Sequence, residues 1–564
     1  MKEKMKLLIK NNIQYIFILI ASIIICIPLL SKNLDIYRDD GIQHVCRLIG
    51  TYESLNTAEL LPMIMSNFCN NFGYSWNIFY SPFTAYVPLI FKIFNLSFVN
   101  CIKLFMFVIT LISGIAMYKF VFKVTKNKNI SVFASIIYIL APYRITDMYI
   151  RNALAELASF VFLPIIFNGL YTILNEEKKS YTLAWGAIGL FLTHSVITLY
   201  TAILCFIYLL VFIKKLKNKK VLITLVTNLL FVIVITSFFW VGLMQHYLAT
   251  TYEVFVPGRM QRFDVMKSLK VGISQLFYTS SNQTMIFDIG LVIIIGLILT
   301  PLAYKKIPKE YRRINTLFLV LGLVLVIMTL KFFPFEKLPN FLTMLQFTFR
   351  LFEFTSFFFA FVAAVNFGAI IKNFNFKDIA LLSVIICLLL VPYNSKISYE
   401  VNFNEKDLIE PVPLTERTGR VHAGMASMEY LPSKAFQNLD YIIDREDVPI
   451  ILEENRQSII QNYEKNGSNM SMEIQNVTEE TSIELPYIYY LGYRIYVNDQ
   501  EISYTESDKG FIQISINEDA QIAVKYTGTN AMIISFIVSI ISFVVLIFIS
   551  NYSKIKTQLN KNRR

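Results

Sequence analysis

Long apolar runs separated by short polar connectors fill most of the chain up to Val391, and one more run lies near the C-terminus. A helix of about 20 apolar residues crosses the roughly 30 Å hydrocarbon core of a bilayer. A shorter apolar segment, 79–94, contains Pro82 and Pro88, so we expect it to lie along the membrane interface. The runs predict about twelve membrane-spanning helices, at residues 13–30, 99–122, 130–141, 153–174, 183–193, 196–213, 222–243, 286–304, 317–330, 347–371, 379–391 and 532–549.

The pattern changes after Pro392. Residues 393–530 are polar, and in their second half apolar and polar residues alternate, as in F-I-Q-I-S-I and I-A-V-K-Y. Such alternation is typical of antiparallel strands. The predicted fold class is a polytopic α-helical membrane protein with a small β-rich domain before its last helix. The predicted domains are 1–392 with a first outer loop at 32–98, the β-rich domain at 393–530, and the last helix with a basic tail at 531–564.

The composition agrees with a membrane protein. Apolar residues make up 55% of the chain and charged residues 16%, against roughly a quarter charged in soluble domains. The net charge of +12 is concentrated in short clusters between spans, such as 214–220 and 305–313. Such clusters mark cytoplasmic loops, so we expect both termini in the cytoplasm and 393–530 outside the cell membrane. A nucleic-acid binder would gather its charge on one folded face, so membrane lipids and not nucleic acid are the expected partners.

The sequence gives little support for a zinc site or for a nucleotide-binding site. No cysteine pair has the spacing of zinc ligands. Cys46 and Cys69 share the first outer loop, and whether they form a disulfide stays open. The chain contains neither a P-loop nor a glycine-rich nucleotide fingerprint. A donor for chemistry on the outer face would therefore have to arrive attached to a membrane lipid.

The first outer loop carries the strongest candidate chemistry. Asp39 and Asp40 stand side by side shortly before His44. A carboxylate at this place can take a proton from an acceptor hydroxyl as a general base, or the pair can hold a hard divalent cation such as Mg²⁺ or Mn²⁺. The alternative is structural, with both aspartates capping a helix that starts near Gln43.

Ionisable residues within or beside apolar spans form two further sets. Arg350 and Glu353 lie three apart in one span, so they can pair on one helix face. A guanidinium near the outer surface also suits a lipid phosphate, which it can hold with two hydrogen bonds. The second set is Arg144, Asp147, Arg151 and Glu156. The spacing of its first three members predicts helical ion pairs, its arginines could equally hold phosphate, and Glu156 has no evident partner.

The predicted topology places all four histidines on or near the outer face. Histidine avoids apolar spans, so clustering at span ends is also expected without any function. The four are His44, a candidate for contact with a donor phosphate, His194 and His246, candidates for supporting roles, and His422.

Five stretches together resemble a known family. They are D-x-x-x-H at 40–44 followed by N-F-G-Y-S-W-N-I-F-Y-S-P, A-P-Y-R-I-T-D-M-Y-I-R-N-A-L-A-E at 141–156, L-T-H-S at 192–195, Q-F-T-F-R-L at 346–351, and L-P-Y-I-Y-Y-L-G-Y-R-I-Y-V-N-D before the last strands. In this order and spacing the chain resembles the bacterial GT-C-fold membrane proteins labelled "6-pyruvoyl-tetrahydropterin synthase-related", which are similar to the YfhO-like family. It departs from the family pattern at Thr348, where proline is frequent, and at Asn152, where glycine is frequent.

The resemblance implies a GT-C glycosyltransferase that transfers a sugar, with inversion, from a polyprenyl-phosphate carrier on the outer face. Carried over to this chain, it implies Asp40 or Asp39 as the base, and Arg350, Arg144 and Arg151 as contacts of the lipid phosphate. The acceptor would be a glycan or lipid of the cell envelope. The alternatives are a non-catalytic transporter or assembly factor for lipid-linked glycans, and a scaffold whose β-rich domain recruits wall enzymes.

Overall fold

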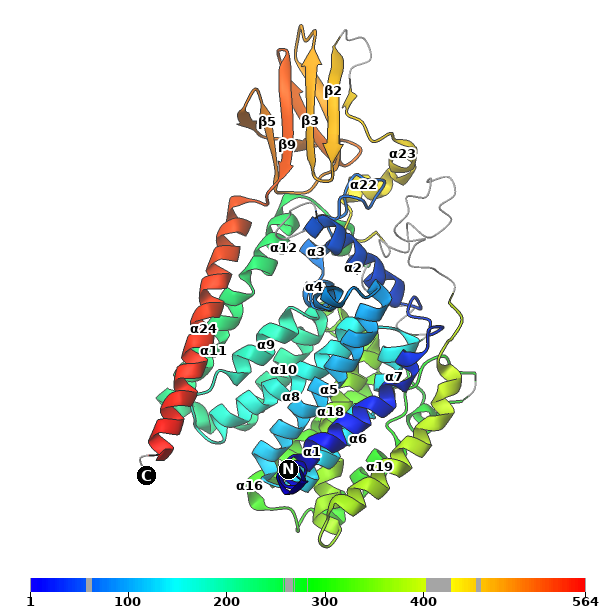
Figure 1. Cartoon of the computed structure of the whole chain (residues 1–564), viewed down its shortest axis with the longest axis vertical. Coiled ribbons are helices and arrows are strands. Elements are labelled where there is room, and N and C mark those ends of the chain that lie inside the picture. Colours follow the sequence, from blue (N-terminus) through cyan, green and yellow to red (C-terminus); the bar gives the residue numbers. More distant parts are fainter. Residues whose placement is uncertain are drawn as a thin grey trace.

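The computed structural model describes residues 2–56, 63–256, 258, 267, 269–280, 282–401, 428–452 and 458–562. Most of this chain is helical (Figure 1). The helices are α1 (Lys2–Cys26), α2 (Gly41–Asn56), α3 (Trp76–Phe79), α4 (Phe83–Tyr86), α5 (Phe98–Thr125), α6 (Lys128–Ile139), α7 (Pro142–Ile145), α8 (Leu154–Leu174), α9 (Thr182–Phe191), α10 (Ser195–Val211), α11 (Lys219–Ile235), α12 (Ser237–Ala249), α14 (Leu291–Ile298), α15 (Thr300–Ala303), α16 (Lys309–Thr329), α17 (Asn340–Thr343), α18 (Leu351–Ile370), α19 (Phe376–Leu390), α22 (Ser433–Gln437), α23 (Leu439–Asp444) and α24 (Asn530–Asn562).

Within the described residues, seven helical segments are long and apolar enough to span a membrane, and nine if each of two bent helix pairs counts as one span. The bent pairs are Lys128–Ile139 with Pro142–Ile150, which meet at 43°, and Lys219–Ile235 with Ser237–Ala249, which meet at 63°. The protein is thus a multi-span helical membrane protein. The predicted number of about twelve spans is not confirmed, because α9 and α14 have only 10 and 8 residues, well short of the roughly 20 that cross a bilayer.

Helix α18 forms the centre of the helix bundle. Of its apolar span, 94% is buried, as expected for a helix that is apolar on all faces. Helices α6, α14 and α16 pack directly against it. Phenylalanine rings fill the contacts: the ring of Phe357 lies 5.1 Å from that of Phe167 on α8, and Phe361 lies 5.1 Å from Phe318 on α16. This packed core fixes the N-terminal end of α18, where Arg350 and Glu353 lie.

A small antiparallel β domain precedes the last helix, as the alternating sequence predicts. Its sheets have the strand orders β1-β4-β8-β7 and β2-β3-β9-β5-β6. Apolar residues such as Met472, which pairs with Ile522, and Ile483, which pairs with Ile514, are buried. Residues 402–427 and 453–457 of the predicted domain lie outside the described residues. The strands are β1 (Ile450–Ile451), β2 (Ile459–Asn466), β3 (Asn469–Gln475), β4 (Thr481–Ile488), β5 (Tyr493–Val497), β6 (Gln500–Ile502), β7 (Thr505–Glu506), β8 (Phe511–Ile516) and β9 (Ala520–Tyr526).

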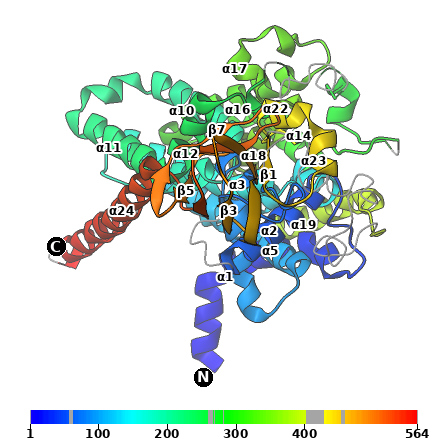
Figure 2. The same cartoon turned by 90° about the horizontal axis from the view of Figure 1, so that it is seen from above.

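The β domain is docked on the first outer loop. The backbone N–H of Ile488 donates to the carbonyl of Phe72 at 2.9 Å, and Lys465 Nζ donates to the carbonyl of Asn71 at 2.7 Å. Seen from above, the sheets cover the middle of the helix bundle and α24 leaves on one side (Figure 2). The loop that carries the candidate aspartates therefore belongs to the same side of the bundle as the β domain.

Candidate active site

The turn between α1 and α2 presents Asp39 and Asp40. The backbone N–H of Asp40 donates to the carbonyl of Arg151 at 3.0 Å, and Asn152 Nδ2 donates to the carbonyls of Asp35 and Arg38 at 3.2 and 3.3 Å. These bonds clamp the turn against the start of α8.

Backbone conformation explains the residue types in this clamp. Asp39 and Asn152 have φ angles of 49° and 50°, in the left-handed region that glycine, asparagine and aspartate adopt most easily. Asn152 is therefore a residue type that suits this backbone conformation. Gly41 has no room for a side chain, because a Cβ there would lie 1.9 Å from the carbonyl oxygen of Ile36.

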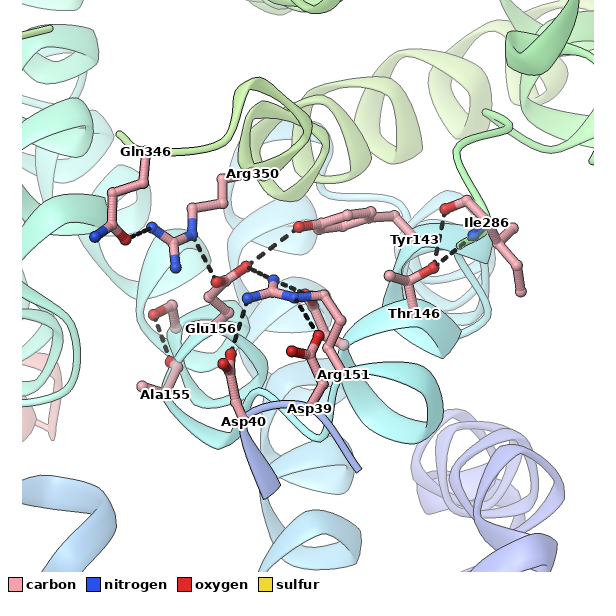
Figure 3. A network of polar contacts seen from close by, with 12 residues as sticks. Asp39, Asp40, Tyr143, Thr146, Arg151, Ala155, Glu156, Ile286, Gln346 and Arg350 are labelled. Atoms are coloured by element: carbon pink, nitrogen blue, oxygen red, sulfur yellow. Dashed lines mark hydrogen bonds and ion pairs between the residues drawn. The ribbon is translucent and has the colours of Figure 1, made fainter. Parts of the chain in front are cut away.

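Arg151 points its guanidinium toward the two aspartates (Figure 3). Its Nη2 donates to Asp40 Oδ2 at 2.9 Å, and its Nε lies 3.7 Å from Asp39 Oδ2. Its Nη1 contacts Glu156 Oε2 at 2.7 Å and Asp147 Oδ1 at 3.4 Å. Every nitrogen of this guanidinium therefore faces a carboxylate, which makes Arg151 the centre of the cluster.

Glu156 connects this arginine to Arg350, a residue from a distant part of the chain. Arg350 Nε donates to Glu156 Oε1 at 2.7 Å, while its Nη1 donates to Gln346 Oε1 at 2.7 Å and to the carbonyl of Leu345 at 2.9 Å. No described residue accepts a hydrogen bond from Nη2. Arg350 thus keeps one donor group for something outside the cluster.

The predicted pair of Arg350 with Glu353 does not form in the described structure. Arg350 turns to Glu156 instead, and neither carboxylate oxygen of Glu353 has a hydrogen-bond partner among the described residues. Both side chains lie at the same end of α18, but the tertiary fold offers Arg350 a carboxylate that sequence spacing cannot reveal.

Of the two helical ion pairs predicted among Arg144, Asp147 and Arg151, only one forms in the described structure. Asp147 contacts Arg151 as expected, but Arg144 donates from Nη2 to Thr110 Oγ1 at 3.0 Å and lies over the ring of Phe160 at 4.9 Å. Arg144 is fully buried, and its Nε and Nη1 have no hydrogen-bond partner among the described residues. It belongs to the interior of the helix bundle and not to the exposed part of the cluster.

Two of the predicted histidines, His44 and His194, make their contacts in the helical part of the chain. His44 lies on α2 with its ring edge toward Tyr80, 6.2 Å between centroids, and burial together with the charge of Arg47 lowers the pKa of His44 to about 3. His194 caps α10 by accepting a hydrogen bond from the backbone of Ile197 at 3.4 Å. His422 lies outside the described residues.

His246 is separate from the cluster. Its Nε2 accepts a hydrogen bond from the backbone N–H of Leu491 at 3.1 Å, while its Nδ1 contacts the carbonyl of Gly242 at 2.8 Å. These contacts join α12 to the β domain. The supporting role predicted for His246 is therefore proposed only as a structural one, at the domain junction.

The aspartates are the most exposed of the charged members of the cluster that the structure describes. The side chains of Asp39 and Asp40 are 46% and 35% exposed, whereas those of Arg151 and Glu156 are each 2% exposed. Partial burial, aided by the negative charge of Asp40 and opposed by Arg151, raises the pKa of Asp39 to about 6. Asp39 is thus ionised near neutral pH and readily accepts a proton.

The aspartates do not fit a metal site. Both carboxylates already face the positive charge of Arg151, and the described part of the chain contains no group of three or more His, Cys, Asp or Glu side chains placed to hold a metal ion.

Cys46 and Cys69 are both buried free thiols, so no disulfide joins them in this structure.

Sequence reasoning missed two members of the cluster. Tyr143 donates from its hydroxyl to Glu156 Oε2 at 3.2 Å, and Gln346 binds Arg350. Both residues lie within stretches that carry the family resemblance, but an aromatic or amide side chain in such a stretch is also a common packing residue. Only their tertiary contacts distinguish them.

Comparisons with known proteins are limited. No family model matches the chain. A protein of Lactococcus lactis subsp. cremoris (strain MG1363), described as uncharacterized, is 25% identical over 340 residues, which cover 57% of this chain and 54% of that protein. The chain therefore spans about half the length of this relative. The cryo-EM structure of the arabinofuranosyltransferase AftD from Mycobacteria aligns with 69% of this chain and 27% of its own, with a TM-score of 0.44 and 12% identity.

Proposed function

We propose that this protein is a GT-C-like membrane glycosyltransferase. It moves a sugar from a polyprenyl-phosphate carrier to a glycan or lipid of the cell envelope, on the outer face of the membrane. The observation that carries the proposal is a pair of partly exposed carboxylates standing on a buried arginine–glutamate network, with a second arginine beside it. A base for the acceptor and a positive charge for the leaving phosphate are the two groups that such a transfer needs.

In this mechanism Asp39 is the general base. As the acceptor hydroxyl oxygen attacks the anomeric carbon, its proton passes to the Asp39 carboxylate. The bond from the anomeric carbon to the phosphate oxygen breaks, and the electron pair leaves with the polyprenyl phosphate. Asp39 suits this role better than Asp40 because its carboxylate is more exposed and lies 3.7 Å from Arg151, whereas Asp40 is held by that arginine at 2.9 Å.

Arg350 is the proposed contact of the donor phosphate. Its Nη2 has no acceptor among the described residues, and the rest of its guanidinium is fixed by Glu156 and Gln346. A guanidinium held in this way loses little conformational freedom on binding phosphate. Arg151 is a positioning residue, because its nitrogens are already directed at carboxylates, and Arg144 is too deeply buried for direct contact.

The proposal is tested by sugar transfer in membranes supplied with radiolabelled polyprenyl-phosphate hexoses. We expect label to leave the carrier with the wild-type protein and not with Asp39→Asn. Asparagine keeps the shape of the side chain and tolerates the left-handed backbone at this position, so insertion and folding should be unchanged. Full transfer by a folded Asp39→Asn/Asp40→Asn double variant would rule out catalysis by this pair.

One observation favours the alternative of a non-catalytic transporter or assembly factor for lipid-linked glycans. Both aspartates contact Arg151, so they also serve as counter-ions of a buried charge. In that case the aspartate variants would lower stability but leave glycan export intact, whereas loss of Arg350 would still weaken binding of the lipid phosphate.

A further inference from the structure

The outward face of the five-stranded sheet carries a groove that the proposed chemistry does not use. Its volume is about 340 Å³, within the range of roughly 300–1,000 Å³ that is usual for ligand sites. It crosses β2, β3, β9 and β5, which stand side by side beyond the helix bundle (Figure 1).

Small side chains form the floor of the groove. Ser471 on β3 pairs with Ala523 on β9, which in turn pairs with Tyr496 on β5, and Glu464 on β2 pairs with Ser471. Paired residues in a sheet point to the same face. This row therefore places two short side chains between two long ones, and Tyr496 and Glu464 become the walls of a trough.

The adjacent row supplies oriented polar groups. Glu473 Oε2 accepts a hydrogen bond from Asn462 Nδ2 at 3.0 Å, and its Oε1 lies 3.5 Å from Gln521 Nε2. The two amides hold the carboxylate in place and leave their own oxygens as further acceptors. A sugar ring offers hydroxyl donors to such groups and an apolar C–H face to an aromatic ring.

Charge narrows the choice of ligand. Glu464, Glu473 and Asp499 contribute carboxylates to the groove, and none of the described residues that line it is basic, although the chain as a whole has a net charge of +12. Like charges repel across a binding surface, so the groove disfavours anionic polymers and suits an uncharged or amine-bearing chain.

We propose that this groove binds a neutral or amino-sugar-containing glycan chain, with Tyr496 as a stacking surface and Glu473 as an acceptor for sugar hydroxyls. That this glycan is the acceptor of the transfer reaction rests on the proposed function. Glycan binding by itself does not.

The test uses the full-length protein in nanodiscs and titration calorimetry with neutral oligosaccharides, namely maltoheptaose, laminarihexaose and chitohexaose, and with anionic hexagalacturonate. We expect at least one neutral oligosaccharide to bind and hexagalacturonate not to bind. Tyr496→Ala, which removes the wall, and Ala523→Gln, which fills the floor, should each weaken binding roughly tenfold or more, as expected when a ring contact is lost or blocked. Lys509→Gln, at an exposed position between β7 and β8 of the other sheet, is the control and should bind as wild type.

Two results would overturn the inference: no binding of any neutral oligosaccharide, or binding that Tyr496→Ala and Ala523→Gln leave unchanged. Equal binding of hexagalacturonate would overturn the charge argument. Failure of the proposed function is distinguishable, because transfer would then be absent in wild type while glycan binding remained. If both hold, Ala523→Gln should lower transfer to a polymeric acceptor and Asp39→Asn should abolish transfer to every acceptor.

Discussion

The carboxylate of Glu156 accepts a hydrogen bond from Arg350 Nε at 2.7 Å, across 194 residues of sequence. The same carboxylate binds Arg151, which holds the exposed aspartates. One buried side chain thus links the start of α8, the N-terminal end of α18 and the turn before α2 (Figure 3). The five predictions that follow examine this link, the base, the stability of the base variant, the turn and the phosphate contact.

Glu156→Gln should destabilise the protein and abolish transfer. Without this charge two buried guanidinium groups lose their shared counter-ion, and breaking a buried pair by removing one partner costs about 3–5 kcal/mol. Thermal unfolding in detergent measures the loss. The control is Glu501→Gln, which removes a surface partner of Arg494 that is 49% exposed and should change the free energy of unfolding by less than about 1 kcal/mol. Equal effects of the two substitutions would contradict the role of Glu156.

Transfer should depend on pH through Asp39. Its pKa is raised to about 6, and only the ionised form can accept a proton, so the rate should rise as pH increases through about 6 and then level off. This rise in rate should vanish in Asp39→Asn together with activity. In Asp40→Asn it should persist at a reduced rate and move to lower pH, because the Asp40 charge that helps to raise the pKa of Asp39 is gone. A rate that stays constant between pH 5 and 8 in wild type would exclude Asp39 as the base.

The same raised pKa has a consequence for stability. The folded protein binds the Asp39 proton more tightly than the unfolded chain, so this stabilisation is full below the unfolded pKa, 3.8, and is lost as pH rises through about 6. Asp39→Asn should therefore unfold at a temperature equal to or above that of wild type at pH 7, because the raised pKa already includes the attraction of Arg151. This measurement separates a catalytic loss from a folding defect.

Gly41→Ala should reduce transfer by roughly a hundredfold or more while the protein still inserts into membranes. The new Cβ would lie 1.9 Å from the carbonyl oxygen of Ile36, so the turn must shift and Asp39 with it. A displacement of about 1 Å at a reacting group can cost this much in rate. Gly272→Ala is the control, since its Cβ would meet only the flexible side chain of Gln275 at 3.3 Å. Wild-type rates in Gly41→Ala would show that the turn does not position the base.

Arg350→Lys should raise the KM for the lipid-linked donor about tenfold. Lysine keeps the positive charge but cannot donate to Glu156, Gln346 and a phosphate in the fixed directions of a guanidinium. Initial rates at varied donor and fixed acceptor concentrations give the KM. Arg494→Lys on the β domain should leave it unchanged. A lower melting temperature with an unaltered donor KM would assign Arg350 a structural role alone.

The sequence predicted the helical membrane domain and the β domain from periodicity, because the hydropathy of a span and the alternation of a strand are local properties. It also singled out Asp39, Asp40, Arg151 and Glu156 as charged residues beside apolar runs, but in two separate sets. Of the ion pairs that helical spacing favoured, only Asp147 with Arg151 forms among the described residues. Helical spacing favoured Arg350 with Glu353 and Arg144 with Asp147, yet neither pair forms among the described residues.

Spacing along a helix describes what a side chain can reach within its own segment. Once α8 and α18 pack together, the buried carboxylate of Glu156 lies between two guanidinium groups, so Arg350 pairs with it and not with Glu353. The separation of His246 from the cluster has the same origin, since the docking of the β domain gives this histidine the backbone N–H of Leu491.

The sequence by itself thus determined that the chain is a multi-span membrane protein with a β domain, and which residues carry its charge. The tertiary structure decided which of those charges meet, which are buried and which stay exposed. The physical reason is that burial in a bundle removes the solvent that would otherwise satisfy each charge, so its position is set by whichever opposite charge the packed helices bring within hydrogen-bonding distance.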